Sequence, residues 1–317
     1  MARVLVTRRL PDHGLDPLVA ARHEIVARAD DTPYAPDELA AAARDVDAIV
    51  CLLTDRIDAA VLEAGAAGGR LKVVANVAVG YDNIDVISAG ALGIAVCNTP
   101  GVLDETTADV AFLLILAASR LARDAEAELR AGRWTGWGIT QYLGQDVHGA
   151  VLGLVGYGRI GQAVARRAAG FGMQVLHHTR RDTGVPGWVP NLDRLLAEAD
   201  VVSLHVPLSD ASHHLISAAE LARMKPTAVL VNTARGPVVD EEALAVALED
   251  GTIFAAGLDV YEHEPAVHPR LLAAPRTVLL PHIGSASVAT RTRMAQTAAQ
   301  SVVDVLAGRR PPTLVTG

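Results

Sequence analysis

The sequence predicts an α/β protein built from two doubly wound units, each with a parallel sheet. Short apolar runs rich in β-branched residues alternate with Ala-rich amphipathic stretches along the whole chain. This is the pattern of strands buried on both faces of a parallel sheet and of the helices that cover them. The runs number ten, which is many for one open sheet. A glycine-rich loop of the phosphate-binding type stands in mid-chain, near residue 156, so we expect a separate unit before it.

The predicted strands follow from the apolar runs. In chain order they are 3–7, 48–53, 72–76, 94–98, 150–156, 174–178, 201–206, 228–233, 255–260 and 277–282. Two of the helices between them have clear boundaries. One begins at the capping-box spacing of Ser217 and Glu220, and another follows Asp240 and ends at Gly251.

The division into units follows from the position of the glycine-rich loop. We expect the first unit over 1–98 and the second over 99–282. The last helix, about 285–307, has no free place beside a sheet that ends at His282. We therefore expect it to return to the first unit, which then also includes 283–317.

Composition narrows the class of protein. Half of the 317 residues are hydrophobic and a fifth are charged, which indicates a compact globular protein rather than a disordered one. The formal net charge of -8 argues against a nucleic-acid partner. Cys51 and Cys97 lie within apolar runs, so we expect reduced core thiols and a cytoplasmic protein. Metal-ligand spacings and apolar segments of membrane-spanning length are both absent from the sequence, so we expect neither a metal nor a membrane partner.

The mid-chain loop has the form of a dinucleotide-binding turn. It reads Gly156-Tyr157-Gly158-Arg159-Ile160-Gly161, directly after an apolar strand and at the start of a helix. The first glycine permits the tight turn, the second lets the backbone approach a pyrophosphate, and the third lets helix pack on strand. The amides and dipole at the helix start favour the anion. A glycine-rich turn without a ligand is the alternative.

The residues after the next strand bear on the choice of cofactor. An NAD site has an acidic residue about 20 positions after the loop, which binds the ribose hydroxyls. Here the strand ends in Thr179-Arg180-Arg181, and the first carboxylate is Asp182. Hydroxyl and guanidinium groups would hold a 2′-phosphate that a carboxylate would repel. We expect NADP(H) to be preferred, with NAD(H) possible; two solvated arginines are the alternative.

Three charged residues lie just beyond predicted strand ends, where open α/β sheets bind ligands: Arg235, Glu264 and His282. The planar fork of an arginine matches a carboxylate. A histidine can serve as an acid near neutrality, and a neighbouring carboxylate favours its protonated form. The set therefore fits reduction of a small 2-oxo acid to a 2-hydroxy acid, with hydride taken from a nicotinamide dinucleotide.

The chain resembles the D-isomer-specific 2-hydroxyacid dehydrogenase family, particularly its glyoxylate/hydroxypyruvate reductase branch. The matching motifs run in family order over nearly the whole chain. They are NVAVGYDNID (76–85), NTPG (98–101), GYGRIG (156–161), HVPL (205–208), NTARG (232–236), DVYEHEP (259–265) and PHIGS (281–285). The resemblance implies a flavodoxin-like substrate domain, a dinucleotide-binding Rossmann domain, and an active site in the cleft between them.

The resemblance also implies the roles of individual residues. It makes Arg235, Glu264 and His282 the catalytic set, with Glu264 rather than Glu262 selected by the following Pro265. Substrate-binding residues would be Leu53, Val79, Gly80, Arg235 and His282, the backbone amides around Val79 and Gly80 holding the carboxylate. Besides the six residues of the glycine-rich loop and Thr179, Arg180 and Arg181, the cofactor would contact Thr107, Val206, Pro207, Thr233, Ala234, Asp259 and Gly284.

The segment before the dinucleotide strand is rich in aromatic residues for a chain with few of them. Trp134, Trp137 and Tyr142 lie close together there, which suggests a buried contact surface. A small local core beneath a loop is the alternative. The resemblance implies a homodimer formed through this arm, residues 121–148.

Two other functions remain open from the sequence. One is a sibling activity, such as that of a D-lactate or phosphoglycerate dehydrogenase, because pocket size cannot be read from sequence. The other is a non-catalytic protein that senses NAD(P), because a fold does not by itself specify a function. The three charged groups at strand ends argue against the second alternative.

Overall fold

The computed structural model describes residues 1–28 and 30–315. The chain divides into two compact units: unit 1 comprises Met1–Leu103 and the residues from Ala286 onward, and unit 2 comprises Asp104–Ser285. The divisions predicted from sequence lie at 98/99 and 282/283. The expected fold class is confirmed, since each unit is an α/β domain with one parallel sheet.

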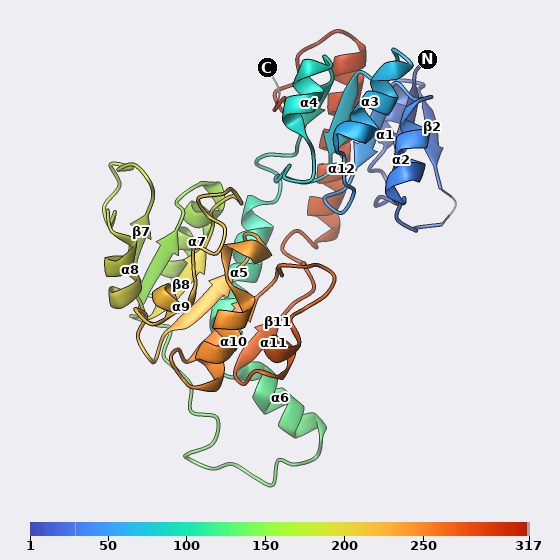
Figure 1. The fold of residues 1–317 in the computed structure, drawn as a ribbon. Helices are drawn as coiled ribbons and strands as arrows, with labels where there is room; N and C mark the ends of the chain where they lie inside the picture. Colours follow the sequence, from blue (N-terminus) through green and yellow to red (C-terminus); the bar gives the residue numbers. More distant parts are fainter. Residues whose placement is uncertain (29, 316–317) are drawn as a thin grey trace. The chain divides into compact units, whose positions relative to one another are not determined.

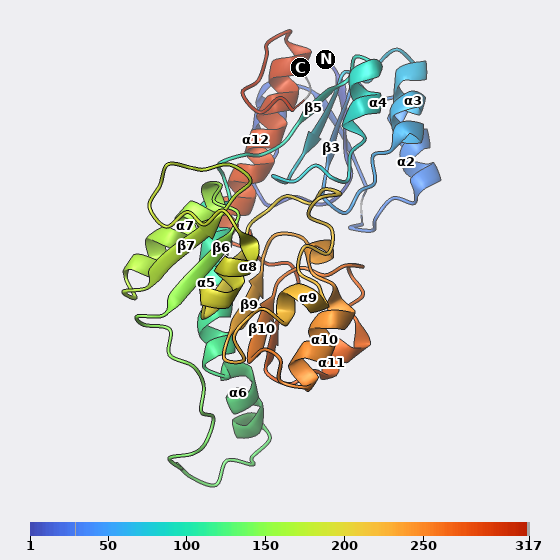
Figure 2. The same ribbon diagram turned by 60° about the vertical axis from the view of Figure 1, so that its left-hand side comes forward.

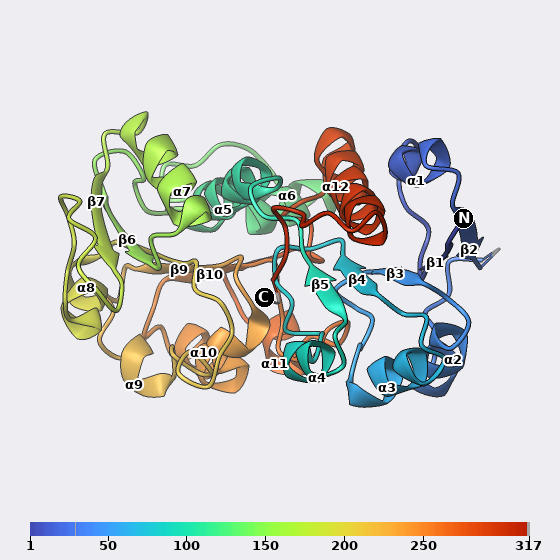
Figure 3. The same ribbon diagram turned by 90° about the horizontal axis from the view of Figure 1, so that it is seen from above.

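Unit 1 has a five-stranded parallel sheet in the order β2-β1-β3-β4-β5. Helices α1 and α12 cover one face, and α2, α3 and α4 cover the other (Figure 3). The strands are β1 (Arg3–Val6), β2 (Glu24–Ala27), β3 (Ala48–Cys51), β4 (Val73–Asn76) and β5 (Ala95–Cys97). The helices are α1 (Asp16–Ala20), α2 (Pro36–Ala43), α3 (Ala59–Ala67), α4 (Val86–Ala91) and α12 (Val288–Leu306).

The sequence prediction missed β2. This strand lies at the edge of the sheet and pairs only with β1. Its central residues Ile25 and Val26 are half-buried, whereas Glu24 and Ala27 are exposed. An edge strand covers less apolar surface than a central one, so its sequence lacks the long apolar run that indicated the other strands.

Helix α12 belongs to unit 1. Its first turn is capped by Ser287, whose hydroxyl accepts a hydrogen bond from the Thr290 amide. Met294, Ala298 and Val302 repeat at helical spacing on its buried face and pack into the core above β1, β3 and β4. Burial of this apolar stripe is what holds the last helix on the sheet of unit 1.

Unit 2 has a six-stranded parallel sheet in the order β11-β10-β9-β8-β6-β7. Helices α5 and α7 cover one face, and α8 to α11 cover the other (Figures 1 and 3). The strands are β6 (Val151–Val155), β7 (Gln174–His178), β8 (Val201–Leu204), β9 (Val229–Asn232), β10 (Ala255–Leu258) and β11 (Thr277–Leu279). The helices are α5 (Asp104–Ser119), α6 (Ala122–Arg130), α7 (Arg159–Ala169), α8 (Leu192–Glu198), α9 (Ala218–Leu221), α10 (Glu241–Glu249), α11 (Pro269–Ala273) and the 3-10 helix η1 (Gly236–Val238).

Both helix boundaries predicted in unit 2 are confirmed. Ser217 and Glu220 form the capping box of α9, which is only four residues long. Asp240 caps α10 by accepting a hydrogen bond from the Ala243 amide. Just after α10, Gly251 has a φ of 78°, a left-handed conformation in which a side chain would be strained.

The cysteines behave as the sequence predicted. Cys51 and Cys97 are free thiols buried in the core of unit 1. Burial raises the pKa of Cys97 to about 11 and that of Cys51 well above its usual value, so both thiols stay protonated near neutrality. Within residues 1–28 and 30–315, no helix is both long and apolar enough to cross a membrane. The same residues contain no group of His, Cys, Asp or Glu side chains placed to hold a metal ion.

Candidate active site

The register of the unit 2 sheet brings the ends of its strands to one edge. Val155 of β6 pairs with Leu204 of β8, and Leu204 pairs with Asn232 of β9. Asn232 in turn pairs with Leu258 of β10, which pairs with Leu279 of β11. The loops that follow these five strands therefore start level with one another. All the predicted catalytic residues lie in those loops.

The three loop glycines have different surroundings. Gly156 has a φ of 97°, and a Cβ atom there would lie 2.5 Å from the His205 carbonyl oxygen. At Gly161 a Cβ would lie 2.5 Å from the carbonyl oxygen of Gly156, so this glycine lets α7 approach the turn. At Gly158 no described atom beyond the two adjacent residues lies within 4 Å of the Cβ position. Two glycines are thus required by the protein itself, whereas the third leaves space for a ligand.

The start of α7 is suited to an anion. Its N-cap is Gly158, and no side chain caps the amides of its first turn. Uncapped amides and the helix dipole favour a phosphate group. Beside them the ring of Tyr157 stacks on that of His177 at the end of β7, with 3.9 Å between ring centroids. The loop therefore fits the pyrophosphate of a dinucleotide, with Arg159 and Ile160 in the first turn of the helix.

The loop after β7 is folded back on the strand. The buried ring of His177 lies 2.7 Å (Nε2) from the Thr183 hydroxyl, and burial lowers the pKa of this histidine. The Thr179 hydroxyl donates to the Arg181 carbonyl oxygen (2.6 Å), and the Asp182 carboxylate accepts from the Gly184 amide (2.8 Å). Arg180 and Arg181 are exposed, and neither forms an ion pair with a described residue. Two guanidinium groups are therefore available at the strand end, while the nearest carboxylate in sequence is bound to local backbone.

His282 and Glu264 form an ion pair. His282 Nδ1 lies 2.8 Å from Glu264 Oε2, and the two side chains are 28% and 29% exposed. The other carboxylate oxygen of Glu264 accepts from the Tyr261 amide (3.0 Å). Burial alone would raise the pKa of Glu264, but the hydrogen bond and charge of His282, with the charge of Arg235, hold it below its usual value. Glu264 is therefore an anion that faces the imidazole near neutrality.

The structure thus distinguishes the two glutamates of the DVYEHEP segment. Glu262 does not meet His282; its carboxylate accepts from the Glu241 amide (2.8 Å) and lies 3.1 Å from His214 Nε2. Of these two glutamates, only Glu264 forms a pair with the imidazole of His282, as the resemblance implied.

Arg235 follows β9 and is held by its own backbone. Asn232 Nδ2 donates to the Arg235 carbonyl oxygen (2.8 Å), and the guanidinium donates to the Ala234 carbonyl oxygen (2.8 Å). At the next residue, Gly236, a Cβ would lie 1.8 Å from the carbonyl carbon of Tyr261. Only glycine permits this approach, which brings the Arg235 turn against the loop that carries Glu264.

Asp259 holds the loop that carries His282. It is buried at the end of β10, and its two oxygens accept from the amides of Ile283 and Gly284, each at 2.7 Å. Burial raises the pKa of this carboxyl, and the two amide bonds oppose that shift. The residue predicted to contact the cofactor therefore also fixes the backbone next to His282.

The remaining predicted cofactor residues of unit 2 lie near the same strand ends. The Thr233 hydroxyl is buried and has no hydrogen-bond partner among the described residues. Such an orphaned group fits a site completed by a polar ligand. Thr107 is buried next to Gly284, and Val206 and Pro207 follow β8.

The predicted substrate loop of unit 1 is fixed by three asparagine side chains. Asn76 and Asn98 donate to the carbonyl oxygens of Gly80 and Val79, each at 2.8 Å, and Asn83 ties the loop to Leu52 and Asp55. Within the described part of the chain, the Val79 and Gly80 amides have no hydrogen-bond acceptor. The carbonyls are thus bound and the amides remain available to an anion. Leu53 lies exposed at the end of the neighbouring strand.

The aromatic arm is exposed in the single chain. Helix α6 and the loop after it extend away from the sheet of unit 2 (Figures 1 and 2). Trp134, Trp137, Ile139 and Leu143 are exposed, Trp137 to 80%. The alternative of a small local core is therefore wrong, because none of residues 121–146 is buried.

Sequence reasoning missed two residues that form hydrogen bonds in and around the loop that carries Glu264. The Tyr261 amide donates to Glu264, and the Tyr261 hydroxyl donates to the Leu280 carbonyl oxygen (2.9 Å). Glu241, at the start of α10, accepts hydrogen bonds from the amides of Glu262 and His268. An acidic residue in a first helical turn is common for electrostatic reasons, so its sequence position carried no signal of this role.

Comparison with known proteins agrees with this geometry. Residues 112–284 match the family described as D-isomer specific 2-hydroxyacid dehydrogenase, NAD binding domain. The glyoxylate reductase of Korarchaeum cryptofilum is 48% identical over 323 residues, which cover 99% of this chain and 95% of that protein.

Two solved structures are similarly close. A protein from Thermus thermophilus has a TM-score of 0.93 and 45% identity, covering 99% of this chain and all of that one. An NADPH-dependent glyoxylate/hydroxypyruvate reductase from Sinorhizobium meliloti, solved with NADP and malonate, has a TM-score of 0.85 and 36% identity over 99% of this chain and 96% of that one. The resemblance recognised in the sequence is confirmed. The chain belongs to the D-isomer specific 2-hydroxyacid dehydrogenase family and is an NAD(P)-dependent oxidoreductase.

Proposed function

We propose that this chain reduces glyoxylate and hydroxypyruvate to the corresponding 2-hydroxy acids, with His282 as the acid and NADPH as the preferred cofactor. The observation that carries the proposal is the His282–Glu264 ion pair, 2.8 Å long, at the strand ends that also present Arg235 and the dinucleotide loop. The names of the relatives, glyoxylate reductase and glyoxylate/hydroxypyruvate reductase, support the choice of substrate.

The proton route follows from the ring nitrogens of His282. Nδ1 faces the Glu264 carboxylate, so Nε2 is the nitrogen left to donate to the substrate oxygen. Glu264 stabilises the imidazolium before transfer. It is itself held in place by the Tyr261 amide. A bound nicotinamide supplies the hydride to the carbonyl carbon.

The substrate would be held through its charge and its carbonyl oxygen. We assign the first task to Arg235 and to the amides of Val79 and Gly80, which have no acceptor among the described residues. A planar guanidinium can bind a carboxylate and also polarise a neighbouring carbonyl group. Leu53 would supply an apolar contact for the small carbon skeleton.

The preference for NADPH is supported by the end of β7. Arg180 and Arg181 are exposed there without ion pairs to described residues, and Asp182 is bound to the Gly184 amide. A 2′-phosphate would gain charge-assisted hydrogen bonds from the two guanidinium groups. The ribose hydroxyls of NAD carry no charge and would gain less.

The test is cofactor oxidation followed at 340 nm with glyoxylate, hydroxypyruvate, pyruvate and phosphohydroxypyruvate in parallel. NADPH and NADH are each compared by kcat/KM. We expect the highest values with glyoxylate or hydroxypyruvate and NADPH. Highest turnover with pyruvate or phosphohydroxypyruvate would assign a sibling activity, and a clear preference for NADH would contradict the cofactor proposal. Cofactor binding without turnover of any acid would indicate a sensing protein.

We further propose that the chain forms a homodimer through the arm at 121–148. Helix α6 has no buried residue in the single chain, and the loop after it exposes two tryptophans. Large exposed apolar side chains grouped on one segment are typical of a surface that a partner covers.

A further inference from the structure

Glu241 lies outside the reacting groups, yet its carboxylate closes the base of the loop that carries Glu264. We propose that Glu241 is a positioning residue: it holds loop 262–268 closed and thereby keeps Glu264 against His282. The proposal rests on the proposed function of the His282–Glu264 pair.

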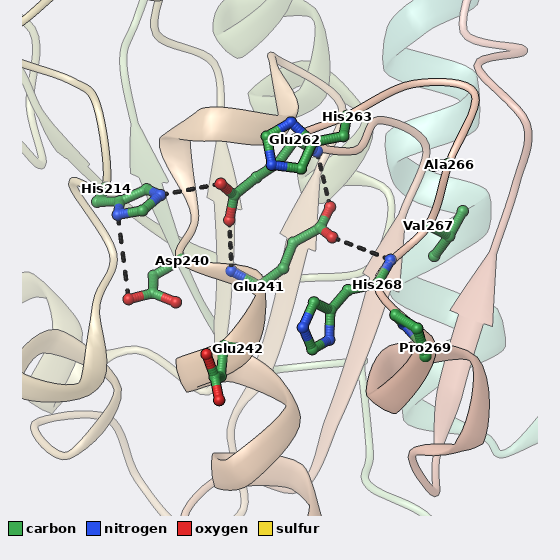
Figure 4. Close-up of a pocket in the computed structure, with 10 residues that line it drawn as sticks. All are labelled: His214, Asp240, Glu241, Glu242, Glu262, His263, Ala266, Val267, His268 and Pro269. Carbon is green, nitrogen blue, oxygen red and sulfur yellow. Dashed lines mark hydrogen bonds and ion pairs between the residues drawn. The ribbon is translucent and has the colours of Figure 1, made fainter.

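The Glu241 carboxylate links the two ends of one short loop by hydrogen bonds. Glu241 is 5% exposed, and its Oε1 accepts from the Glu262 amide at 2.8 Å while its Oε2 accepts from the His268 amide at 3.3 Å. Figure 4 shows the carboxylate between these two backbone positions. In return, the Glu262 carboxylate accepts from the Glu241 amide and reaches His214.

Between the tied ends the chain makes a tight turn. The Ala266 amide donates to the His263 carbonyl oxygen (2.8 Å), and Glu264 lies within this turn. From there its carboxylate reaches back to the Tyr261 amide and across to His282. Opening the base of the loop would move Glu264 with it, because few other bonds fix the turn.

Packing does little to hold the middle of this loop. His263 and Ala266 are exposed and line, together with Glu241, a pocket of about 420 Å³ (Figure 4). Side chains that face a pocket gain little from close contact. Val267 packs against the core of unit 2 and supports the His268 end of the loop, so the hydrogen bonds of Glu241 are what link the Glu262 end to it.

Helix capping does not account for Glu241. The cap of α10 is Asp240, which accepts from the Ala243 amide. Burial of Glu241 and the nearby charge of Glu262 both raise its pKa, which is a cost that the two amide bonds oppose. The Glu241 carboxylate is buried, is not needed as a helix cap, and has both oxygens bound to one loop. Its burial is therefore best explained by its hold on loop 262–268.

The experiment compares Glu241→Gln with Glu242→Gln. In the first variant one oxygen becomes an NH₂ group that faces a backbone N–H, so one tie is lost. Glu242 is the matched control, because it is next on the same helix, lines the same pocket and only approaches Arg270 at 3.7 Å. Two kinds of measurement are made on each variant: hydrogen exchange of the 262–268 amides, and the kinetics as kcat, KM and the pH profile.

We expect Glu241→Gln to speed exchange of the loop amides and to lower kcat about ten- to hundredfold, with little change in KM for NADPH. The acidic limb of the pH profile should move to higher pH, because the hydrogen bond and charge of His282 hold the pKa of Glu264 low and the pKa rises when the pair loosens. The other charges around that pair, Arg235 and Asp259, stay in place. Glu242→Gln should behave as wild type.

Equal exchange and equal kinetics in the two variants would overturn the inference. If Glu241→Gln fails to fold, Glu241→Asp replaces it, because a shorter carboxylate reaches only one of the two amides and should give the same changes. A wild-type enzyme without turnover would instead reject the proposed function. The exchange measurement would still test the tie in that case.

Discussion

Two glycines of the dinucleotide loop should respond oppositely to the same substitution, alanine. At Gly161 the new methyl group would lie 2.5 Å from the Gly156 carbonyl oxygen, a backbone atom that cannot rotate away. Overpacking of this kind costs about 1–3 kcal/mol. For a domain of this size that corresponds to a fall in Tm of roughly 2–12 °C. At Gly158 the methyl group meets no described atom beyond the two adjacent residues within 4 Å, and the backbone, at φ -75°, already suits alanine.

Gly158→Ala should therefore change stability by less than about 1 kcal/mol, because the smaller entropy of the unfolded chain offsets the poorer helix cap that alanine makes at the N-cap of α7. Its methyl group would instead enter the space proposed for the pyrophosphate. The same overpacking cost, applied to binding, weakens NADPH affinity roughly 5- to 150-fold.

Thermal unfolding of both variants without ligand, and fluorescence titration with NADPH, separate the two effects. A loss of stability in Gly158→Ala as large as that in Gly161→Ala would refute the assignment of free space at Gly158. Unchanged NADPH affinity in Gly158→Ala would refute the assignment of that space to the cofactor.

Three further predictions concern other parts of the chain. His282→Ala should lower kcat by about 10²–10⁴ while leaving the Kd for NADPH nearly unchanged, as isothermal titration would show; near-wild-type turnover would exclude this histidine as the acid. Burial lowers the pKa of His205 from 6.5 to about 4, so its contribution to stability is complete above pH 6.5 and is lost as the pH falls toward 4. Between pH 7.5 and pH 5, the free energy of unfolding in urea should fall by about 2 kcal/mol less in His205→Gln than in wild type. An equal fall in both proteins would contradict this account. Trp137→Glu should give a monomeric mass in light scattering, whereas Ile87→Glu, at a residue 84% exposed outside the arm, should not; a wild-type monomer would reject the dimer.

Much of the fold was predictable because strands and helices leave local patterns. All ten predicted apolar runs contain a strand of the structure, and both predicted helix caps are present. Eight of the ten predicted runs extended one to three residues past the last residue of the strand, because the sequence does not show where the ladder of backbone hydrogen bonds ends. The edge strand β2 was missed because half of its residues face solvent.

The candidate site was predictable in its residue types but not in its contacts. Arg235, Glu264 and His282 stood out because they lie just beyond strand ends, where open α/β sheets bind ligands, and the family motifs agreed with them. No local sequence pattern indicated the role of Glu241 or the stacking of His177 on Tyr157. Each joins segments about twenty residues apart or more, and nothing in the local pattern of either segment requires the other.

The sequence by itself determined the strand–helix alternation, the glycine-rich turn and the kinds of charged groups at the strand ends. These depend on periodicity and on short-range sterics, which neighbouring residues specify. Only the tertiary structure decided which glutamate meets His282, which carboxylate ties the loop, and which glycine leaves room for a ligand. Those outcomes depend on strand register and on backbone approaches of a few ångströms between distant segments, which arise only when the sheet has assembled.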